Sequence, residues 1–325
     1  MFIRKYILIV MFGGYCNNIT LIFNNHFQLF LVNKNFINWL IFSILALTWG
    51  SSFILMKLGL QQLSPYQVAA LRIFAAGILL LPITIKYIRT IPKSNLMLLF
   101  LSGTLGSLLP AFLFCVAEEK LDSAIAGILN SLTPVFVIIT GVLFFKATTT
   151  ANKTTGILIA FLGCVLLFLS KGHLLVDMNF TSTSLIILAT ILYGFNVNMV
   201  SKNLLHIPSL HIAAVALSFN AIPALLVLIY TGYFKLPLGN KDVLLATGAA
   251  VLLGVLGTAI ATILFYILVK RAGGIFASMV TYGIPFVAIG WGIIYGESFG
   301  WAQAFCLIII LAGVFYTTRK KVQIV

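Results

Sequence analysis

One charged residue lies well inside an apolar segment. Arg72 is about 9 Å from the end of the segment 66–85, at a rise of 1.5 Å per residue. An arginine at such a depth in a membrane usually faces a cavity or a partner. It could anchor an anionic or carboxylate substrate, extend to the nearby interface, or form a fixed ion pair with an acidic residue. We favour structural pairing over the substrate role.

Two aromatic side chains, a serine and a methionine share one face of the preceding segment. They are spaced i, i+3, i+4 and i+7, the pattern of one helix face, and are Trp49, Ser52, Phe53 and Met56. At a spacing of 144 residues, Tyr193 and Asn196 correspond to Trp49 and Ser52. Aromatic walls with a few hydrogen-bonding groups are typical of small-molecule sites. Helix–helix packing with polar interhelical contacts explains the pattern equally well.

Two prolines, Pro134 and Pro285, lie 151 residues apart inside apolar segments. Proline in a membrane helix removes a backbone hydrogen bond and exposes a carbonyl group. In transporters such breaks provide polar backbone near the midplane and permit bending, whereas the structural alternative is a static kink. Polar residues beside the two prolines are further candidates for substrate binding, namely Asn130, Thr133, Thr281 and Tyr282.

The same spacing of 151 residues relates two glycine-containing stretches. Residues 103–114 read GTLGSLLPAFLF and residues 254–265 read GVLGTAIATILF. Small residues let membrane helices approach closely. We therefore predict helix packing at the four shared glycines, which are Gly103, Gly106, Gly254 and Gly257. The common spacing indicates that the chain consists of two corresponding halves.

Composition decides the solvent in which the chain folds. Hydrophobic residues make up 61% of the sequence, charged residues only 8%, and the mean hydropathy is +1.14. Soluble domains carry about 25% charged residues, so this chain is predicted to fold in a lipid bilayer. Its net charge of +14 comes from cations scattered singly between apolar runs. Nucleic-acid binding is not predicted, because it would require a clustered basic face.

Ten apolar segments follow an N-terminal extension, and the connections between them are short. The approximate segments are 36–56, 66–85, 96–116, 124–145, 155–170, 183–200, 210–231, 243–268, 275–296 and 300–317. We predict an all-α integral membrane protein with ten transmembrane helices in two inverted five-helix repeats. The predicted parts are an extension at 1–35, disordered or interfacial, repeats at 36–170 and 183–318, and a basic cytoplasmic tail at 319–325.

Charge gives the predicted orientation in the cytoplasmic (inner) membrane. If both termini are cytoplasmic, fourteen of the twenty Lys and Arg residues fall on the inner side and all six acidic residues on the outer side. Corresponding segments are then five helices apart, an odd number. The two halves must therefore insert in opposite directions.

Few residues suggest catalysis. The four cysteines are scattered and form no C-x-x-C motif, so neither a disulfide framework nor a zinc site is expected. No phosphate-binding Walker loop is present. The nearest approach to a carboxylate cluster is Glu118-Glu119 with Asp122. Glu297 could couple transport to protons, although a solvated or helix-capping carboxylate is the favoured interpretation. We predict no metal, no cofactor and no enzymatic activity.

Several short motifs, in order, resemble one family of carriers. They are Trp49-Gly50-Ser51-Ser52-Phe53 with Lys57, Ser64-Pro65, Leu71-Arg72, Leu129-x-x-Leu132-Thr133-Pro134 and Tyr295-Gly296-Glu297. The chain from 36 to 321 thereby resembles an EamA-type transporter of the drug/metabolite transporter superfamily. This resemblance implies a ten-helix carrier that moves small metabolites, often outward, without a nucleotide-binding domain. One departure is Phe145-Lys146, where the second half has Gly296-Glu297.

The predicted function is therefore secondary transport of a small metabolite across the cytoplasmic membrane, as export, by alternating access. An integral-membrane enzyme and a non-transporting membrane subunit are the alternatives. The predicted partners are the lipid bilayer and the metabolite, and a homodimer is a further option.

Overall fold

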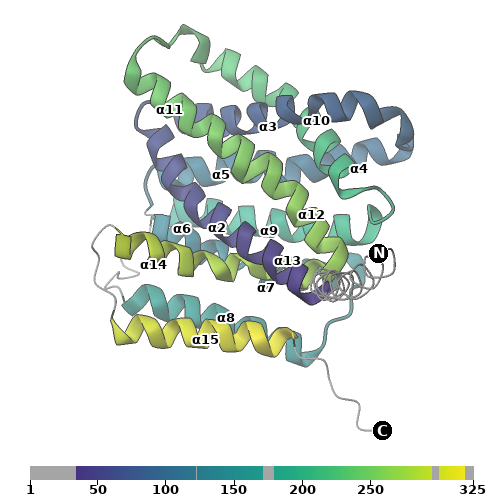
Figure 1. Ribbon diagram of the computed structural model, residues 1–325, viewed down its shortest axis with the longest axis vertical. Coiled ribbons are helices and arrows are strands. Elements are labelled where there is room, and N and C mark those ends of the chain that lie inside the picture. Colours follow the sequence, from purple (N-terminus) through teal and green to yellow (C-terminus); the bar gives the residue numbers. More distant parts are fainter. Residues whose placement is uncertain (1–33, 122, 171–178, 295–299, 319–325) are drawn as a thin grey trace, which may run out of the picture. The chain divides into compact units, whose positions relative to one another are not determined.

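Every regular element that the structure describes is a helix. The structure is a computed structural model that describes residues 34–121, 123–170, 179–294 and 300–318 (Figure 1). It separates into two units, residues 1–41 and 42–325. Only the start of one helix is described in the first unit, so the predicted extension lies almost wholly outside the described residues. The predicted tail at 319–325 and Glu297 also lie outside them.

The helices follow one another with short connections. In order they are α2 (Lys34–Leu60), α3 (Pro65–Tyr87), η1 (Ile88–Thr90), α4 (Lys93–Gly103), η2 (Thr104–Leu108), α5 (Leu109–Glu118), α6 (Ser123–Asn130), α7 (Thr133–Phe145), α8 (Ala151–Ser170), α9 (Phe180–Asn203), α10 (Ser209–Tyr230), η4 (Tyr233–Lys235), α11 (Lys241–Leu252), η5 (Leu253–Ile260), α12 (Ala261–Ala272), α13 (Gly274–Ser278), η6 (Met279–Gly283), α14 (Ile284–Ile294) and α15 (Trp301–Thr318). Within the described residues, nine helical spans are long and apolar enough to cross a membrane. The apolar stretch Ala151–Leu167 of α8 is shorter.

Local sequence signals explain where several helices begin and end. The Ser64 hydroxyl accepts a bond from the Gln67 backbone N–H, and the Gln67 side chain accepts one from the Ser64 N–H, so a capping box starts α3. Asn179 caps α9 through its side-chain oxygen. At the end of α12, Gly273 has φ of 88°, a conformation that glycine adopts without strain. These signals set the lengths of the helices that surround the cavity described below.

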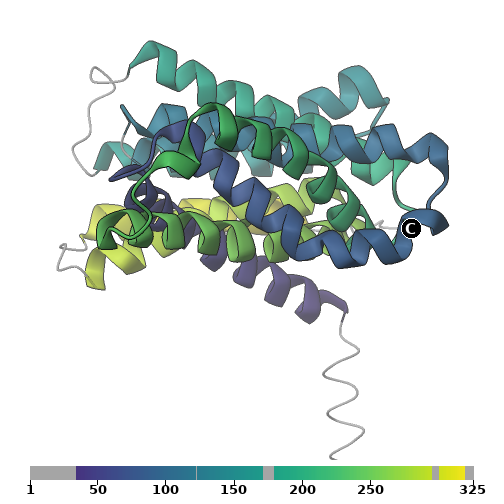
Figure 2. The ribbon, with the colours of Figure 1, turned by 90° about the horizontal axis from the view of Figure 1, so that it is seen from above.

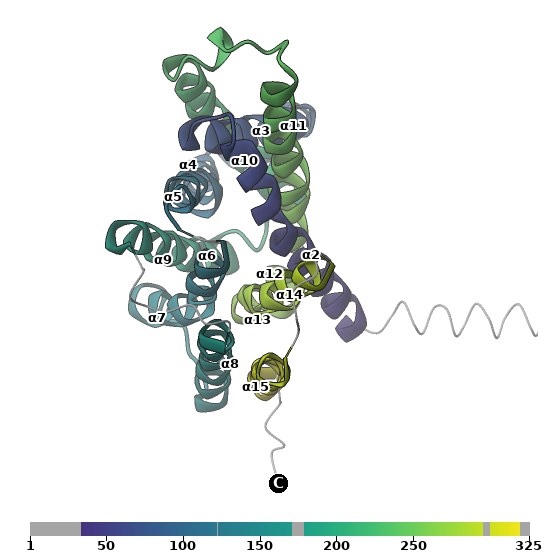
Figure 3. The same ribbon diagram turned by 90° about the vertical axis from the view of Figure 1, so that its left-hand side faces the viewer.

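Two pairs of helices, distant in sequence, lie side by side. Figure 3 looks along many of the helices and shows α8 beside α15 and α3 beside α10. Both contacts depend on glycine. A Cβ atom on Gly77 of α3 would lie 2.5 Å from the Ala221 Cβ of α10, and one on Gly313 of α15 would lie 2.6 Å from the Gly156 carbonyl oxygen of α8. Close backbone approach of this kind is a common way for membrane helices to associate.

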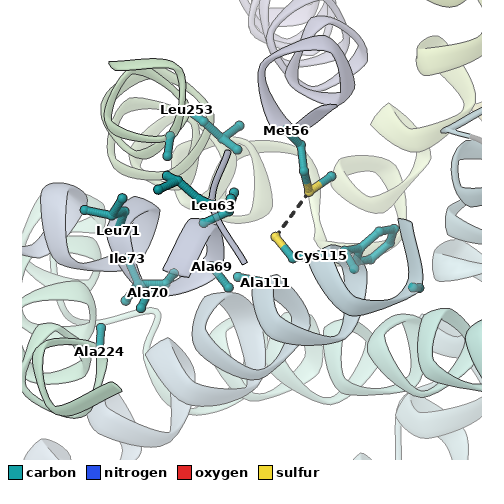
Figure 4. Packing of buried hydrophobic residues seen from close by; sticks show 14 of the residues in the cluster. Met56, Leu63, Ala69, Ala70, Leu71, Ile73, Ala111, Cys115, Ala224 and Leu253 are labelled. Carbon is teal, nitrogen blue, oxygen red and sulfur yellow. Dashed lines mark hydrogen bonds between the residues drawn. The ribbon is translucent and has the colours of Figure 1, made fainter. Parts of the chain in front are cut away.

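An apolar cluster fills the space between α2, α3, α5 and η5. Met56, Leu71, Cys115 and Leu253 are all buried in it (Figure 4). The Cys115 thiol donates to the Met56 sulfur at 3.3 Å, a weak interaction between two soft groups. Outward-facing side chains are apolar as well, including Leu143 at 69% exposure and Leu245 at 72%. Exposed leucines on helices of this length suit a surface in contact with lipid.

Four of the spans are irregular near their middle. The η2 and η5 segments are π-helical, and each contains part of one glycine stretch from the sequence. Two further spans are broken: α6 ends at Asn130 before α7 begins at Thr133, and the 3₁₀ segment η6 separates α13 from α14. In the view of Figure 2 the helices run roughly along one direction, so these irregularities interrupt spans that lie alongside one another. π-segments within α-helices frequently mark functional sites.

Candidate functional site

The irregular segments meet around a cavity of about 120 Å³. Helices from both halves of the chain provide its walls, chiefly α2, α9, α12 and the π-helical and broken spans. The lining residues are Trp49, Ser52, Phe53, Met56, Arg72, Gly106, Ser107, Phe114, Asn130, Thr133, Tyr193, Asn196, Val197, Gly257, Thr258, Thr262, Phe265, Tyr266, Ser278, Thr281 and Ile284. Six of these side chains are aromatic, and ten others carry a hydroxyl, amide or guanidinium group. Apolar walls combined with placed polar groups are typical of small-molecule sites.

Eight of the nine residues that the sequence offered as candidates for substrate binding line this cavity. They are Trp49, Ser52, Arg72, Asn130, Thr133, Tyr193, Asn196 and Thr281. The ninth, Tyr282, is not among the lining residues. It is 1% exposed, and its hydroxyl donates to the Ile157 carbonyl at 2.9 Å, which ties η6 to α8. The predicted amphipathic face of the first segment lines the cavity with all four of its residues.

The lining residues are related by the two sequence spacings described above. Sixteen of the twenty-one fall into eight pairs, three at a spacing of 144 and five at 151. The pairs are Trp49 with Tyr193, Ser52 with Asn196, Phe53 with Val197, Gly106 with Gly257, Ser107 with Thr258, Phe114 with Phe265, Asn130 with Thr281, and Thr133 with Ile284. Corresponding positions in the two halves therefore face the same space.

Helix α2 is tied to the π-helical segment η5. The Trp49 indole Nε1–H donates to the Gly257 carbonyl at 3.0 Å. The Trp49 ring also lies 5.4 Å from the Phe265 ring, centroid to centroid, in a tilted arrangement. Beside it the Ser52 hydroxyl donates to the Thr48 carbonyl at 2.7 Å. Because backbone hydrogen bonding is irregular in a π-segment, η5 offers carbonyl groups to side-chain donors.

Arg72 also contacts η5. Its Nε–H donates to the Thr258 hydroxyl at 3.2 Å, and the side chain is half-buried. The Arg72 guanidinium is close enough to Cys115 and Tyr193 for its positive charge to act on both side chains. Of the three interpretations that the sequence left open, extension to the interface does not describe this contact, because the guanidinium is held at the cavity wall.

A hydrogen-bonded triad joins α4, α9 and α12 on another wall. The Ser102 hydroxyl donates to the Asn196 side-chain oxygen at 2.8 Å and lies 2.9 Å from the Tyr266 hydroxyl. The Asn196 amide donates to the same Tyr266 hydroxyl at 3.3 Å. All three residues are buried. Buried polar groups that satisfy one another in this way fix the relative positions of their helices.

The two broken spans present backbone and hydroxyl groups to the cavity. At the first break, the Thr133 hydroxyl donates to the Asn130 carbonyl at 2.8 Å. At the second, the Thr281 hydroxyl donates to the Ser278 carbonyl at 3.1 Å. Pro134 and Pro285 lie in the first turns of α7 and α14, immediately after the breaks. Each proline thus begins a half-helix, where its missing N–H is not needed.

The four glycines of the repeated stretch lie at helix contacts. Cβ atoms added to Gly103 and Gly254 would meet backbone carbonyl oxygens, those of Ala216 in α10 and Arg72 in α3. Added to Gly106 and Gly257, they would meet the side chains of Asn196 in α9 and Ser52 in α2. Gly103 and Gly254 therefore let backbone approach backbone of the opposite half, whereas Gly106 and Gly257 leave room for a polar side chain from that half.

Several lining residues were not predicted from the sequence. Phe114 and Phe265 end the repeated stretches, and Ser107 and Thr258 are their small hydroxyl residues. The repeat spacing could have identified these four once one member of each pair was placed in a site. Thr262, Tyr266 and Ser278 have no lining counterpart at either spacing, so sequence repetition carried no signal for them.

Comparison with known proteins identifies the family. The model of the EamA-like transporter family matches the chain twice, over residues 37–169 and 181–319. The chain belongs to the EamA-like transporter family. It is a multi-pass membrane protein and a membrane transporter. Within the described residues, no group of His, Cys, Asp and Glu side chains is arranged to hold a metal ion.

Individual relatives agree with this family. An uncharacterized transporter of Archaeoglobus fulgidus is 31% identical over 129 residues, which are 40% of this chain and 46% of that protein. This alignment therefore spans less than half of the relative. A second uncharacterized transporter of the same organism is 28% identical, covering 87% of this chain and 98% of the relative. Protein PagO of Salmonella typhimurium is 22% identical and covers 86% and 91%.

The fold of the EamA-family chain is also similar to that of a solved crystal structure. The two share a TM-score of 0.65 and 18% sequence identity, over 86% of this chain and 95% of the other. At that identity the similarity concerns the fold alone.

Proposed function

We propose that this EamA-family protein is a secondary transporter that exports a small metabolite across the cytoplasmic membrane by alternating access. One observation carries this proposal: eight pairs of residues at the two repeat spacings line one cavity. A site built from corresponding positions of two halves is how repeat-based transporters bind substrate between the halves. Neither half contains the whole site, so movement of one half against the other changes access to it.

Contacts between the halves support an inverted arrangement of ten helices. The π-helical span of the first half packs on α9 and α10, whereas that of the second half packs on α2 and α3. These contacts are reciprocal, as a two-fold relationship requires. Because corresponding spans would be separated by five crossings, the two halves would run in opposite directions through the bilayer. We place both termini in the cytoplasm, in accordance with the distribution of Lys and Arg.

The broken spans support a site near the middle of the membrane. Non-helical backbone is tolerated at membrane depth where it is buried in protein or lines a cavity. The breaks after Asn130 and around Thr281 both lie at the cavity. We assign substrate contact to their polar groups, to the aromatic wall formed by Trp49 and Tyr193, and to Ser52, Asn196 and Arg72. Pro134 and Pro285 would let the two half-helices change angle.

Counterflow in proteoliposomes tests transport. Vesicles that contain the purified protein are loaded with each member of a metabolite panel, and exchange with the labelled compound outside is measured. The Asn130→Ala variant is expected to lose exchange by about tenfold or more, since it removes a polar group that the site would use in binding. Leu245→Ala, a change at an exposed apolar position of α11, is the matched control and should exchange as the wild type does.

Accessibility from the two sides of the membrane tests alternating access. A single cysteine is placed at Ser52 in a variant whose four native cysteines are replaced by alanine. Alternating access predicts that a membrane-impermeant maleimide labels this cysteine from either side, in right-side-out and in inside-out vesicles. Labelling from one side only, together with an absence of counterflow for the whole panel, would refute the proposed function.

A further inference from the structure

Arg72 departs from the repetition of the cavity wall. The carbonyl oxygen of Arg72 faces Gly254 in the way that the Ala216 carbonyl oxygen faces Gly103. Arg72 and Ala216 are 144 residues apart, the spacing that also relates Trp49 to Tyr193. The second half therefore makes the same contact between helices with an alanine. Packing at this position does not require a charge, and the arginine side chain needs another explanation.

A charge at this depth is costly unless it meets an opposite charge or a polar cavity. Among the described residues that line the cavity, Arg72 alone carries a formal charge. Its contact with Thr258 engages Nε–H, one of the five N–H donors of a guanidinium group. Thr258 belongs to η5 and lines the cavity itself, so this bond holds the guanidinium beside the space that a ligand would occupy.

Glu118 is the competing partner. It is 6% exposed at the end of α5 and lies within electrostatic range of Cys115, the thiol that is also close to Arg72. Glu118 is not among the residues that line the cavity. Arg72 could form a structural ion pair with Glu118 or anchor a bound anion, and the two roles predict different effects of mutation. The first makes Arg72 and Glu118 equally important for stability, whereas the second makes Arg72 alone important for binding.

The rest of the wall defines the body of the ligand. Six of the lining residues are aromatic: Trp49, Phe53, Phe114, Tyr193, Phe265 and Tyr266. The Phe114 and Tyr193 rings lie 6.3 Å apart, centroid to centroid. Tyr193 is also close enough to Arg72 to be affected by its positive charge. Aromatic side chains bury a large apolar surface and leave little room for a heavily hydrated solute. Ten other lining side chains carry a hydroxyl, amide or guanidinium group, so the wall suits a ligand with an aromatic or apolar body and at least one polar group.

We propose that the substrate of this cavity is a small carboxylate with an aromatic or apolar body, and that its carboxylate binds Arg72. This substrate class rests on the transport function proposed above. Guanidinium groups recognise carboxylates through paired, charge-assisted hydrogen bonds. Since arginine stays protonated at all physiological pH values, the anchor would be permanent.

Three compounds of similar size and different charge show whether the cavity selects its ligand by charge. Phenylacetate is the anion, phenylacetamide its neutral analogue and phenethylammonium the cation. Binding of each to the purified full-length protein in detergent is measured by calorimetry. We expect phenylacetate to bind about 10- to 100-fold more tightly than either of the others, the range that one charge-assisted interaction supplies. Equal or tighter binding of the amide or the ammonium compound, or binding of none in the millimolar range, overturns the proposal.

Variants connect this preference to Arg72. Arg72→Gln should weaken phenylacetate binding by about 10- to 100-fold and leave phenylacetamide binding unchanged, whereas Arg72→Lys should keep part of the preference. Arg89→Gln, which removes an exposed cation that does not line the cavity, is the matched control. Glu118→Gln should preserve the preference for phenylacetate. Unchanged phenylacetate binding in Arg72→Gln contradicts the proposal. If that variant does not fold, the affinities of the wild-type protein for the three probes test the proposal.

Failure of this substrate class and failure of transport give different results. Counterflow of neutral or cationic compounds without a preference for carboxylates leaves transport in place and overturns the role of Arg72. Tight, Arg72-dependent binding of phenylacetate without counterflow or two-sided access supports the anion site and overturns transport.

Discussion

The indole N–H of Trp49 donates a 3.0 Å hydrogen bond to the carbonyl group of Gly257, 208 residues later in the chain. The donor belongs to the first membrane span of one half and the acceptor to the π-helical segment of the other. Since both residues line the cavity, this bond connects the position of α2 to the shape of the site. If the two halves move relative to each other during alternating access, this hydrogen bond either breaks or keeps α2 and η5 moving together.

Replacement of Trp49 by phenylalanine tests this connection. Trp49→Phe removes the N–H donor and keeps an aromatic ring. We expect a loss of about 0.5–1.5 kcal/mol in unfolding free energy, the usual net contribution of one hydrogen bond. Counterflow should fall several-fold, because the wall would no longer be fixed to η5. Trp301→Phe is the control, since Trp301 is 93% exposed at the start of α15. If the two variants exchange equally fast, Trp49 has no role in positioning η5.

Gly254→Ala should be strongly destabilising. A Cβ atom at this position would lie 3.0 Å from the Arg72 Cα and even closer to its carbonyl oxygen. Backbone atoms cannot turn away as a flexible side chain can, so α3 and η5 must separate. We expect a cost of about 1–3 kcal/mol, typical of overpacking a core, measured by thermal unfolding of the protein in detergent.

Gly248 provides the matched control for this substitution. It lies six residues earlier in the same span, and a Cβ atom there would meet nothing within 4 Å. Gly248→Ala should be neutral or stabilising by up to about 1 kcal/mol, because alanine favours the helix. Equal stability of the two variants would show that α3 does not pack closely on η5.

Sequence reasoning succeeded where one physical rule acted over a short range. Membrane character followed from composition, and helical periodicity placed Trp49 to Met56 on one helix face, although it left cavity lining and helix packing equally open. Membership of the EamA family followed from motifs and is confirmed by the family match. Each of these needs only local spacing or an average over the chain.

What the sequence did not predict depends on contacts between distant segments. Tyr282 looked like the other polar residues beside Pro285, yet its hydroxyl bonds to α8 instead of facing the cavity. Tyr266 and Ser102 attracted no attention, because each becomes significant only through Asn196. The π-helical form of η2 and η5 was likewise not predicted. Glycine-rich apolar sequence is compatible with ordinary α-helix, and the choice depends on the helices that pack against it.

The triad of Ser102, Asn196 and Tyr266 should behave as one unit. Tyr266→Phe removes the hydroxyl that contacts both other side chains, and Ser102→Ala removes a donor to Asn196. Each change alone should cost about 1–3 kcal/mol, because it leaves buried polar atoms without partners. In a double-mutant cycle the combined cost should be smaller than the sum, by about 0.5 kcal/mol or more. Additive costs would mean that the three groups act independently.

Pro134→Ala is expected to change the rate of transport more than its affinity. Pro134 lies in the first turn of α7, where the backbone N–H that alanine restores has no carbonyl partner in the same helix. The fold should therefore be nearly unaffected. However, alanine removes the obstacle to a continuous helix from α6 into α7, which would stiffen the break beside Asn130 and Thr133. We expect counterflow to slow several-fold at saturating substrate with KM nearly constant.

Pro82→Ala, at an exposed position inside α3, is the control. A raised KM with an unchanged maximal rate would instead assign Pro134 to shaping the binding site.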